Sequence, residues 1–383
     1  MYNNSKHILL LFLIGLSAIT NAQNTTVEDT ITSEKKGLFK RIYEYFEKSN
    51  EENPNKRFDF SIIGGPHYSS DTKLGLGLVA SGLYRIDKED RSISPSNASL
   101  YGDITTSGAY VIGISGNAIF PKMNYRIDGD MYFAYRPSRY WGVGYEAGRQ
   151  DYYSEYDNQV IELKFDFLKK ITENTYLGLT TNVKDVRGRN FEDISLLEDE
   201  KLKTTAVGTG LILSYDSRDF IPNPYKGIYA KLEYIYYPKF LGSSHNLNRT
   251  EVIFRYYKKV WERGVIAYDL QGILNNGTVA WNMMAVTGNS YQMRGYYAGR
   301  YRDRNLIQSQ VELRQRIYHR SGAVVWAGVG NVFPKFSEFE WDQTLPTFGI
   351  GYRWEFKNRV NVRLDYGIGK GESAFYFNIN EAF

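Results

Sequence analysis

The sequence predicts an all-β protein, a sixteen-stranded antiparallel transmembrane β-barrel with a long loop folded into its lumen and a short N-terminal helical segment. Three observations predict this fold. Side chains alternate with a period of two from about residue 57 onward, the apolar face of that alternation is rich in aromatic residues, and short connections alternate with long ones. The composition agrees, because 33 tyrosines, 21 phenylalanines and 35 glycines accompany a negative mean hydropathy.

The composition also excludes several classes of protein. The chain has no cysteine, which rules out disulfides, thiolate chemistry and lipid attachment to an N-terminal cysteine. A net charge of +4 on 383 residues is too small to indicate nucleic-acid binding. No nucleic-acid partner is therefore expected.

Residues 1–22 have the pattern of a secretory signal peptide. Lys6 and His7 precede an apolar run over residues 8–19, and Ala22 is a small residue suited to peptidase cleavage. The run is shorter than the roughly 20 residues that a membrane-spanning helix needs. We therefore expect an exported protein whose signal peptide is cleaved after Ala22.

Residues 23–56 are polar and are predicted to form a short periplasmic segment before the barrel. Part of this segment places apolar side chains at helical spacing, which predicts an amphipathic helix, with a solvated linker as the alternative. The apolar positions are Leu38, Phe39, Ile42, Tyr45 and Phe46. The segment is too short to form a folded domain.

Residues 57–383 carry the alternation that predicts the outer-membrane barrel. Over residues 347–356, aromatic and aliphatic side chains face one way, while glycine, threonine and charged side chains face the other. A soluble β-sandwich also alternates, but it turns its apolar face inward and its polar face to water. Here the polar face combines glycine with paired charges, which suits a lumen, and the aromatic face suits lipid.

Sixteen strands can be placed along this region, separated by turn signals. They are residues 58–66, 73–85, 97–106, 110–120, 124–136, 157–170, 173–185, 203–217, 226–238, 247–260, 263–275, 305–319, 321–331, 345–356, 359–369 and 373–383. Residues 139–149 also alternate, but a seventeenth strand would break the parity of short turns and long loops. We therefore predict that they form an ordered surface excursion after the fifth strand.

The predicted last strand ends on the final residue of the chain. Its apolar positions are Phe375, Phe377, Ile379 and Phe383. An aromatic C-terminus on an alternating strand resembles the signal by which the barrel assembly machinery recognises barrels for insertion. It predicts a protein of the bacterial outer membrane, in contact with that membrane's lipid and lipopolysaccharide.

Two stretches resemble motifs of the BamA/TamA outer-membrane proteins, also called bacterial surface antigens. The first is "YDSRDFIPNPYKG" at residues 215–227, and the second is "QMRGYYAGR" at residues 292–300. The second holds the family's hydrophobic-Arg-Gly-aromatic pattern as Met293, Arg294, Gly295 and Tyr296. In the family, the first motif joins the eighth and ninth of sixteen strands and the second follows the eleventh, as in our placement. The resemblance covers about residues 58–383.

The first motif has a structural interpretation of its own. Asp216, Arg218 and Asp219 are expected to pair with one another in a tight turn. Pro222 fixes its backbone φ angle, and Gly227 relieves the backbone before the next strand. We expect all five residues to be structural.

The second motif implies a loop that folds back into the barrel, where its arginine pairs with acids on the lumen face. Glu312 matches the family's acid on the next strand. The following strand should offer an aspartate in a D-x-G pattern, but Gly328 stands there, so Asp365 is the predicted substitute. The alternative is that these arginines lie at the loop tip and bind solvent or lipopolysaccharide phosphates.

No enzymatic chemistry is expected. His67, His245 and His319 are far apart in the predicted topology, which argues against a catalytic dyad or a histidine metal site. The glycine-rich residues 75–83 lack the lysine and the helix of a phosphate-binding loop. We expect neither a cofactor nor a metal.

The resemblance implies a role in outer-membrane protein or lipid biogenesis, by insertion or translocation at a weak seam between the first and last strands. Family members with this role carry POTRA domains, which residues 23–56 are too short to hold. A separate periplasmic or lipoprotein partner is therefore expected. The alternatives are a passive pore, or a surface interaction barrel that acts through long loops such as residues 185–202.

Overall fold

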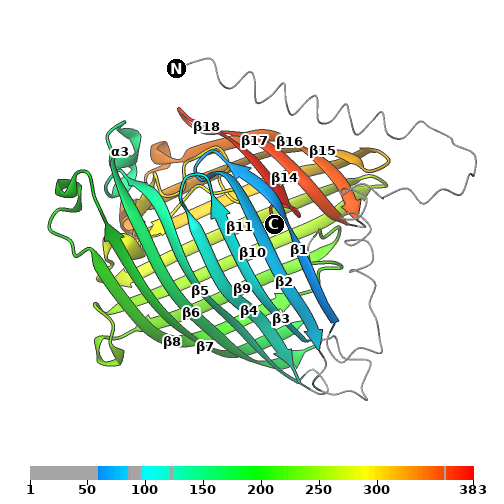
Figure 1. Ribbon diagram of the computed structural model, residues 1–383, viewed down its shortest axis with the longest axis horizontal. Helices are drawn as coiled ribbons and strands as arrows, with labels where there is room; N and C mark the ends of the chain where they lie inside the picture. Colours follow the sequence, from blue (N-terminus) through cyan, green and yellow to red (C-terminus); the bar gives the residue numbers. More distant parts are fainter. Residues whose placement is uncertain (1–58, 85, 87–95, 121–123, 222, 358) are drawn as a thin grey trace, which may run out of the picture. The chain divides into compact units, whose positions relative to one another are not determined.

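Sixteen antiparallel strands close into a single barrel, which confirms the predicted fold class (Figure 1). The structure is a computed structural model that describes residues 59–84, 86, 96–120, 124–221, 223–357 and 359–383. The predicted signal peptide and the predicted periplasmic segment lie outside the described residues.

Each barrel strand pairs with its neighbour in sequence, so the barrel has up-and-down topology. The strands are β1 (Asp59–Ser69), β2 (Lys73–Tyr84), β3 (Ser96–Thr105), β4 (Tyr110–Ile119), β5 (Tyr125–Tyr140), β6 (Ser154–Thr172), β7 (Thr175–Arg189), β8 (Lys203–Asp216), β9 (Gly227–Tyr237), β10 (Leu247–Trp261), β11 (Gly264–Gly277), β14 (Asn305–Tyr318), β15 (Ser321–Phe333), β16 (Leu345–Lys357), β17 (Val360–Ile368) and β18 (Ser373–Ile379). Strand β11 pairs directly with β14, because the two short strands between them form a separate sheet inside the connecting loop. These two are β12 (Ala285–Val286) and β13 (Arg302–Asp303).

In the part of the chain that the structure describes, helical structure is confined to the connections. The elements are α3 (Gly144–Arg149), η2 (Ile194–Leu197), η3 (Lys239–Leu241), η4 (Trp281–Met283), η5 (Phe336–Glu338) and η6 (Trp341–Gln343). Among the described residues, no helix is both long and apolar enough to cross a membrane. The predicted excursion at residues 139–149 is confirmed, since β5 ends at Tyr140 and α3 follows.

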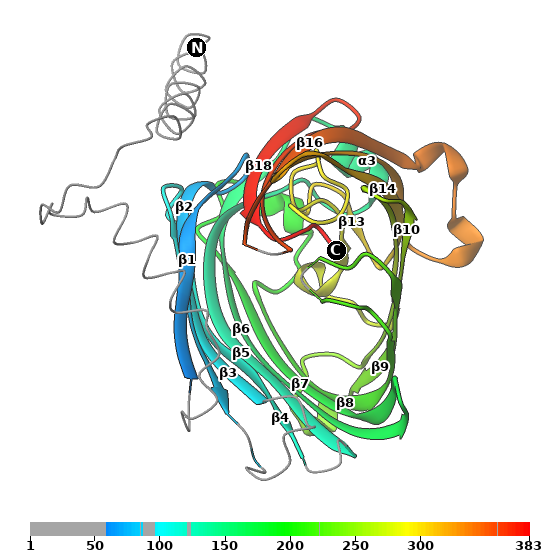
Figure 2. The ribbon, with the colours of Figure 1, turned by 90° about the vertical axis from the view of Figure 1, so that its right-hand side faces the viewer.

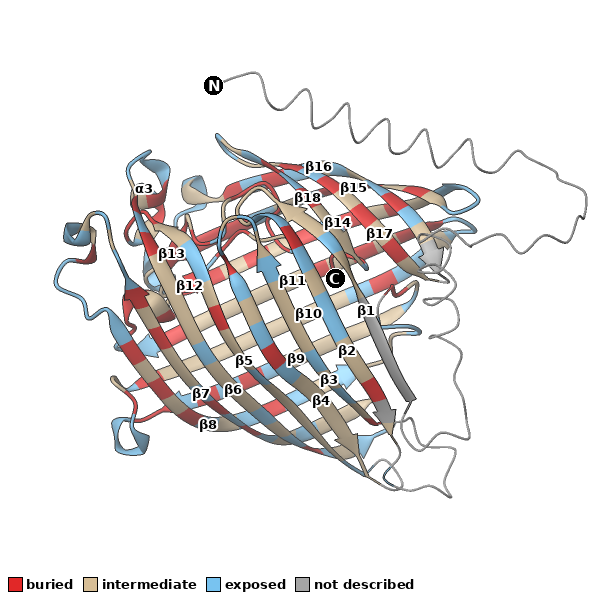
Figure 3. Cartoon of the chain, in the orientation of Figure 1, coloured by how far each residue is buried: buried red, intermediate tan, exposed pale blue. Residues whose placement is uncertain are grey.

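Differences in burial recur along the barrel strands, as the alternation of side chains predicts (Figure 3). On β16, Phe348 and Ile350 are 52% and 65% exposed on the outer face, whereas Thr347 and Arg353 are buried on the inner face. Leu74, Leu76 and Leu78 of β2 are likewise exposed. An outer face of this kind is stable only against lipid, because a soluble protein would leave that apolar area in water.

The connections are longer at one end of the barrel. Residues 141–153, 190–202, 278–304 and 334–344 are long loops at one end, while residues 173–174, 262–263 and 319–320 are two-residue turns at the other. Among the described connections, residues 217–226 are the long exception at the short-turn end, and they hold the first sequence motif. In outer-membrane barrels the short turns face the periplasm.

The barrel closes through few contacts between its first and last strands. Strands β1 and β18 share two register pairs, Tyr68↔Phe377 and Ser69↔Tyr376. By contrast, β1 shares eleven pairs with β2, and β17 shares seven with β18. We call this junction the seam; its pairs lie at the long-loop end, and the rest of the β1 edge has no register partner in β18.

The prediction that the last strand runs to the final residue is wrong. Strand β18 ends at Ile379, and Asn380 adopts a left-handed φ of 69° that turns the chain out of the wall. Glu381, Ala382 and Phe383 are then buried, and the C-terminus lies inside the ring of strands (Figure 2). The tail is buried because Glu381 forms ion pairs with two arginines on the lumen side of the wall.

Candidate functional site

The loop between β11 and β14 places Arg294 inside the barrel, against two acids of the wall. The side chain of Arg294 is fully buried. Its Nη2 donates to Glu312 of β14, and its Nη1 donates to Oδ2 of Asp365 of β17 at 2.7 Å. The guanidinium carbon also lies 3.7 Å from the ring centroid of Trp326 on β15. The structure thus brings together the arginine and both acids that the sequence singled out.

These acids belong to a larger cluster of buried charges on the lumen wall. Arg353 of β16 donates to Asp365 at 2.6 Å and to Glu381 at 2.8 Å. Arg314 donates to Glu312 at 2.9 Å. The sequence predicted the last strand to continue to residue 383, so it could not show that Glu381 enters this cluster.

Gly328 faces the lumen beside Arg294, where the family pattern has an acid. It pairs in register with Gln310 and Thr347. A Cβ atom at Gly328 would lie 2.7 Å from the carbonyl oxygen of Ser309, so a side chain does not fit there without a shift of backbone. The acid that is missing from β15 is supplied two strands away, by Asp365 on β17.

The tip of the loop rests directly on the backbone of β17. A Cβ atom at Gly367 would lie 2.6 Å from the carbonyl carbon and oxygen of Arg294. Gly295 has a φ of 113°, and a Cβ atom there would lie 2.8 Å from the backbone of Ile368. Both positions therefore require glycine, because each lets two backbones approach within contact distance.

Hydrogen bonds to backbone groups fix the tip in this place. The Gly295 amide donates to the Tyr376 hydroxyl at 3.1 Å, and Thr347 donates its hydroxyl to the Arg294 carbonyl. The Tyr296 hydroxyl donates to the carbonyl of Pro346 at 2.6 Å and accepts from the amide of Lys370 at 2.8 Å. The Gly295 amide, the Arg294 carbonyl and the Tyr296 hydroxyl are thus bonded by groups of β16, β18 and the connection after β17.

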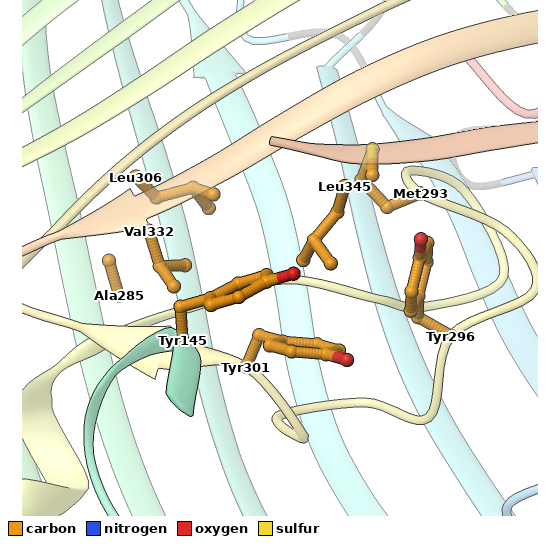
Figure 4. Packing of buried hydrophobic residues seen from close by; sticks show 8 residues of the cluster. All are labelled: Tyr145, Ala285, Met293, Tyr296, Tyr301, Leu306, Val332 and Leu345. Carbon is orange, nitrogen blue, oxygen red and sulfur yellow. The ribbon is translucent and has the colours of Figure 1, made fainter. Parts of the chain in front are cut away.

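The apolar residues of the motif enter a buried cluster beneath the loop (Figure 4). Its members are Tyr145, Ala285, Met293, Tyr296, Tyr301, Leu306, Val332 and Leu345. They come from α3, the loop and three barrel strands, so the loop packs as a small core of its own against the wall. The four motif residues therefore divide their roles: Met293 and Tyr296 pack, Gly295 permits close approach, and Arg294 is held by charge.

The same loop is also held by acids at the long-loop rim, one on each side of the seam. The amide of Ala298 donates to Asp71, between β1 and β2, at 3.0 Å, and the amide of Tyr297 donates to Glu372, between β17 and β18, at 3.1 Å. Burial raises the pKa of the Asp71 carboxyl, and burial likewise raises the pKa of Glu372. Sequence reasoning missed both acids, because neither lies on a strand face.

The first motif forms a turn that is tied to a neighbouring turn. Arg218 donates to both carboxylate oxygens of Asp216, at 2.9 and 2.6 Å. The expected pair between Asp219 and Arg218 does not form. Asp219 instead pairs with Arg359, which follows β16, at 2.9 Å, and it accepts hydrogen bonds from backbone amides of its own turn. Gly227 has the left-handed φ of 112° that the turn requires, and Pro222 lies outside the described residues.

Three residues of the predicted C-terminal signal share one face of β18, and Phe383 does not. Phe375 is 37% exposed on the outer face, and Phe377 and Ile379 are half-buried. Phe383 instead lies in the lumen, where Arg314 donates to an oxygen of its main-chain carboxylate at 2.8 Å. Its assignment to the lipid-facing alternation is therefore wrong.

The contacts of this site hold a loop against the barrel wall. Among the described residues, no group of three or more acids, histidines or cysteines could hold a metal ion. His67 is bonded to Asp103 in the wall. What the arrangement does is bind a loop, by charge and by close backbone contact, to strands that flank the seam.

Comparisons with known proteins agree with this geometry. The family model described as the Omp85 superfamily domain matches residues 116–383. The chain belongs to the Omp85 superfamily. No curated protein sequence matched it.

Solved structures show the same fold as this Omp85 barrel. BamA from Haemophilus ducreyi, in a form lacking POTRA domains 1–3, matches with a TM-score of 0.61 and 12% identity, over 85% of this chain and 70% of that one. CdiB from Acinetobacter baumannii matches at 0.56 and 12%, over 85% and 60% of the two chains. CdiB from Escherichia coli matches at 0.56 and 12%, over 90% and 70%. At this identity the likeness shows the fold of a BamA/TamA-like barrel.

Replacing Arg294 with alanine should destabilise the barrel by about 3–5 kcal/mol, because Glu312 and Asp365 would remain buried without their shared cation. The free energy of unfolding in detergent measures this loss. Arg149→Ala is the matched control, since that arginine is 62% exposed on α3. Equal stability of the two variants would contradict the role given to Arg294.

Replacing Gly367 with alanine should undock the loop, because the added Cβ overlaps the Arg294 backbone. Overpacking of this kind costs about 1–3 kcal/mol, so trypsin should cut within residues 288–304 at least about fivefold faster than in the wild type. Gly272→Ala is the control, since a Cβ there has its nearest neighbour at 3.9 Å. Unchanged cleavage in Gly367→Ala would show that the loop does not depend on this contact.

Acidification should strengthen loop docking rather than weaken it. Burial raises the pKa of Asp71 and Glu372. At pH values between the ordinary pKa and the raised pKa of these groups, the folded protein therefore binds more protons than the unfolded chain. Stability therefore falls as pH rises through the raised values. The melting temperature should be higher at pH 5 than at pH 8, and Asp71→Asn with Glu372→Gln should reduce that difference.

The control for this titration is Asp199→Asn with Glu200→Gln, two exposed acids of the β7–β8 loop. These substitutions remove the same charge but should leave the pH dependence unchanged. A double variant of Asp71 and Glu372 that kept the full pH dependence would rule out these two groups as its source.

Proposed function

We propose that this Omp85 barrel takes part in outer-membrane protein or lipid biogenesis, as an insertion or translocation factor in the bacterial outer membrane. The observation that carries the proposal is the seam, which holds two register pairs. Backbone groups along an unpaired strand edge are ready to bond to an added strand. A seam of this kind therefore suits a barrel that receives or admits a client.

The loop supports the proposal because it binds elements on both sides of the seam. Asp71 belongs to the β1 side, while Asp365 and Tyr376 belong to β17 and β18. These contacts hold the two edges together at the long-loop end, where the register pairs also lie. Opening would then begin at the short-turn end, where a client arrives from the periplasm.

The proposed partners follow from this location. The outer face meets membrane lipid and lipopolysaccharide, and the barrel assembly machinery inserts the protein itself. Client capture is assigned to a separate periplasmic or lipoprotein partner. Recovery of such a partner with the intact protein in mild detergent would support the assignment, and recovery of the barrel alone would count against it.

A disulfide across the seam tests the function. The chain has no cysteine, so Tyr68→Cys with Phe377→Cys introduces one bond between directly paired positions. In cells depleted of the wild type, this variant should restore the levels of other outer-membrane proteins and surface lipids under reducing conditions only. Tyr366→Cys with Phe375→Cys is the control, because it links an equivalent pair between β17 and β18 and should restore them in both conditions.

Three outcomes would overturn the proposal. Depletion that left all other outer-membrane proteins and surface lipids unchanged would remove a role in biogenesis. A steady conductance in planar bilayers that increased on replacement of Arg294 would favour a passive pore instead. A surface interaction barrel would be favoured if deletion of the loop at residues 190–202 abolished binding to cells while those levels stayed normal.

A further inference from the structure

A cavity of about 170 Å³ opens at the short-turn end of the barrel, next to the buried charge cluster that holds Arg294. One side is formed by Asn223 and Tyr225, from the turn that holds the first sequence motif. The other sides come from the turns after β10 and β14 and from the lumen wall, and Glu381 of the C-terminal tail also lines it. The first motif thus forms part of a pocket, in addition to the turn that the sequence predicted.

The pocket is strongly basic. Six cationic side chains line it, and they are Lys259, Arg263, Arg314, Arg316, Arg320 and Arg353. Three acids, Glu262, Glu355 and Glu381, also line it, so the cations exceed the acids by three charges. Arg314 and Arg353 pair with Glu312 and Asp365 of the lumen wall. Among the described residues, the positive charge without an ion-pair partner therefore lies at the rim, on Lys259, Arg263, Arg316 and Arg320.

Two of these arginines are buried and still have unused donors. The side chains of Arg314 and Arg353 are 7% and 5% exposed. Nε and Nη2 of Arg314 bond to Glu312 and to Phe383, and Nε and Nη1 of Arg353 bond to Glu381 and Asp365. In each side chain one nitrogen is left, Nη1 of Arg314 and Nη2 of Arg353, and neither has a hydrogen-bond partner.

Buried guanidinium donors without partners are costly, and they indicate a missing acceptor. Arg314 and Arg353 lie on either side of Glu381, at 3.8 and 2.8 Å, so their free nitrogens belong to one small region. A phosphate offers enough oxygens for both nitrogens and for the cations at the rim, and its charge offsets the excess. A single carboxylate has only two oxygens and one negative charge.

We propose that this pocket binds a phosphate group, presented from the periplasmic side either by a phospholipid headgroup or as free phosphate. Arg314 and Arg353 form its floor, and the exposed Arg316 and Arg320 attract the anion at its rim. This site goes beyond the proposed role in biogenesis and does not depend on it. It also accounts for the unmatched positive charge at this end of the lumen.

Equilibrium dialysis of the full chain in uncharged detergent, with radiolabelled inorganic phosphate at constant chloride, tests the proposal. One saturable site per chain is expected. Arg316→Gln with Arg320→Gln should weaken binding about tenfold, since charge-assisted contacts are lost without disturbing the buried cluster. Arg149→Gln with Lys335→Gln removes the same charge from exposed positions at the opposite end and should leave binding unchanged.

Arg353→Lys adds a test of the floor, because it keeps the charge but removes the forked donor. It should abolish phosphate binding in a barrel whose heat-modifiable migration on gels shows that it is folded. Dihexanoyl phosphatidic acid identifies the source: displacement of phosphate at much lower concentration indicates a headgroup, and displacement only at equal concentration indicates free phosphate. Absence of binding by the wild type, or equal weakening in both double variants, would overturn the site.

Discussion

The buried guanidinium of Arg294 is the interaction on which the inserted loop depends. A cation without water is stable only where carboxylates surround it, and in this barrel those carboxylates lie on β14 and β17. The loop leaves the wall after β11, so the ion pairs tie it to strands near the far end of the chain. The ion pairs therefore fix the position of the loop relative to the last strands of the barrel.

Charge alone would not place the tip accurately, because a guanidinium can reach its acids from several directions. The backbone contact between Gly295 and Gly367 removes that freedom, since only one path of the loop brings the two backbones together. The Tyr376 hydroxyl then bonds to the Gly295 amide at the point where β18 meets β1. The motif thus combines attraction, close approach and a polar contact at the seam.

The sequence was sufficient for what depends on local pattern. The period of two located all sixteen strands and placed Glu312 and Asp365 on the lumen face, while the family resemblance implied that Arg294 pairs with acids of that face. It failed where the outcome depends on contacts between distant elements. Asp219 bonds to Arg359 and Asp71 bonds to Ala298, and neither pair has a periodic signal. Phe383 was misplaced because alternation cannot show that the strand ends at Ile379.

The departure of the C-terminus from the wall connects the seam to the buried charges. Had β18 continued past Ile379, more of its edge would have faced β1; instead the chain turns at Asn380 and Glu381 bonds to Arg353 and Asn361. Arg353 also bonds to Asp365, which holds Arg294. One arginine therefore joins the retained tail to the inserted loop. A strand that displaced the tail at the seam would remove the Glu381 partner from Arg353, and the free guanidinium would compete with Arg294 for Asp365. The C-terminal tail at the seam and the docked loop are thus linked through the hydrogen bonds that Arg353 and Asp365 share.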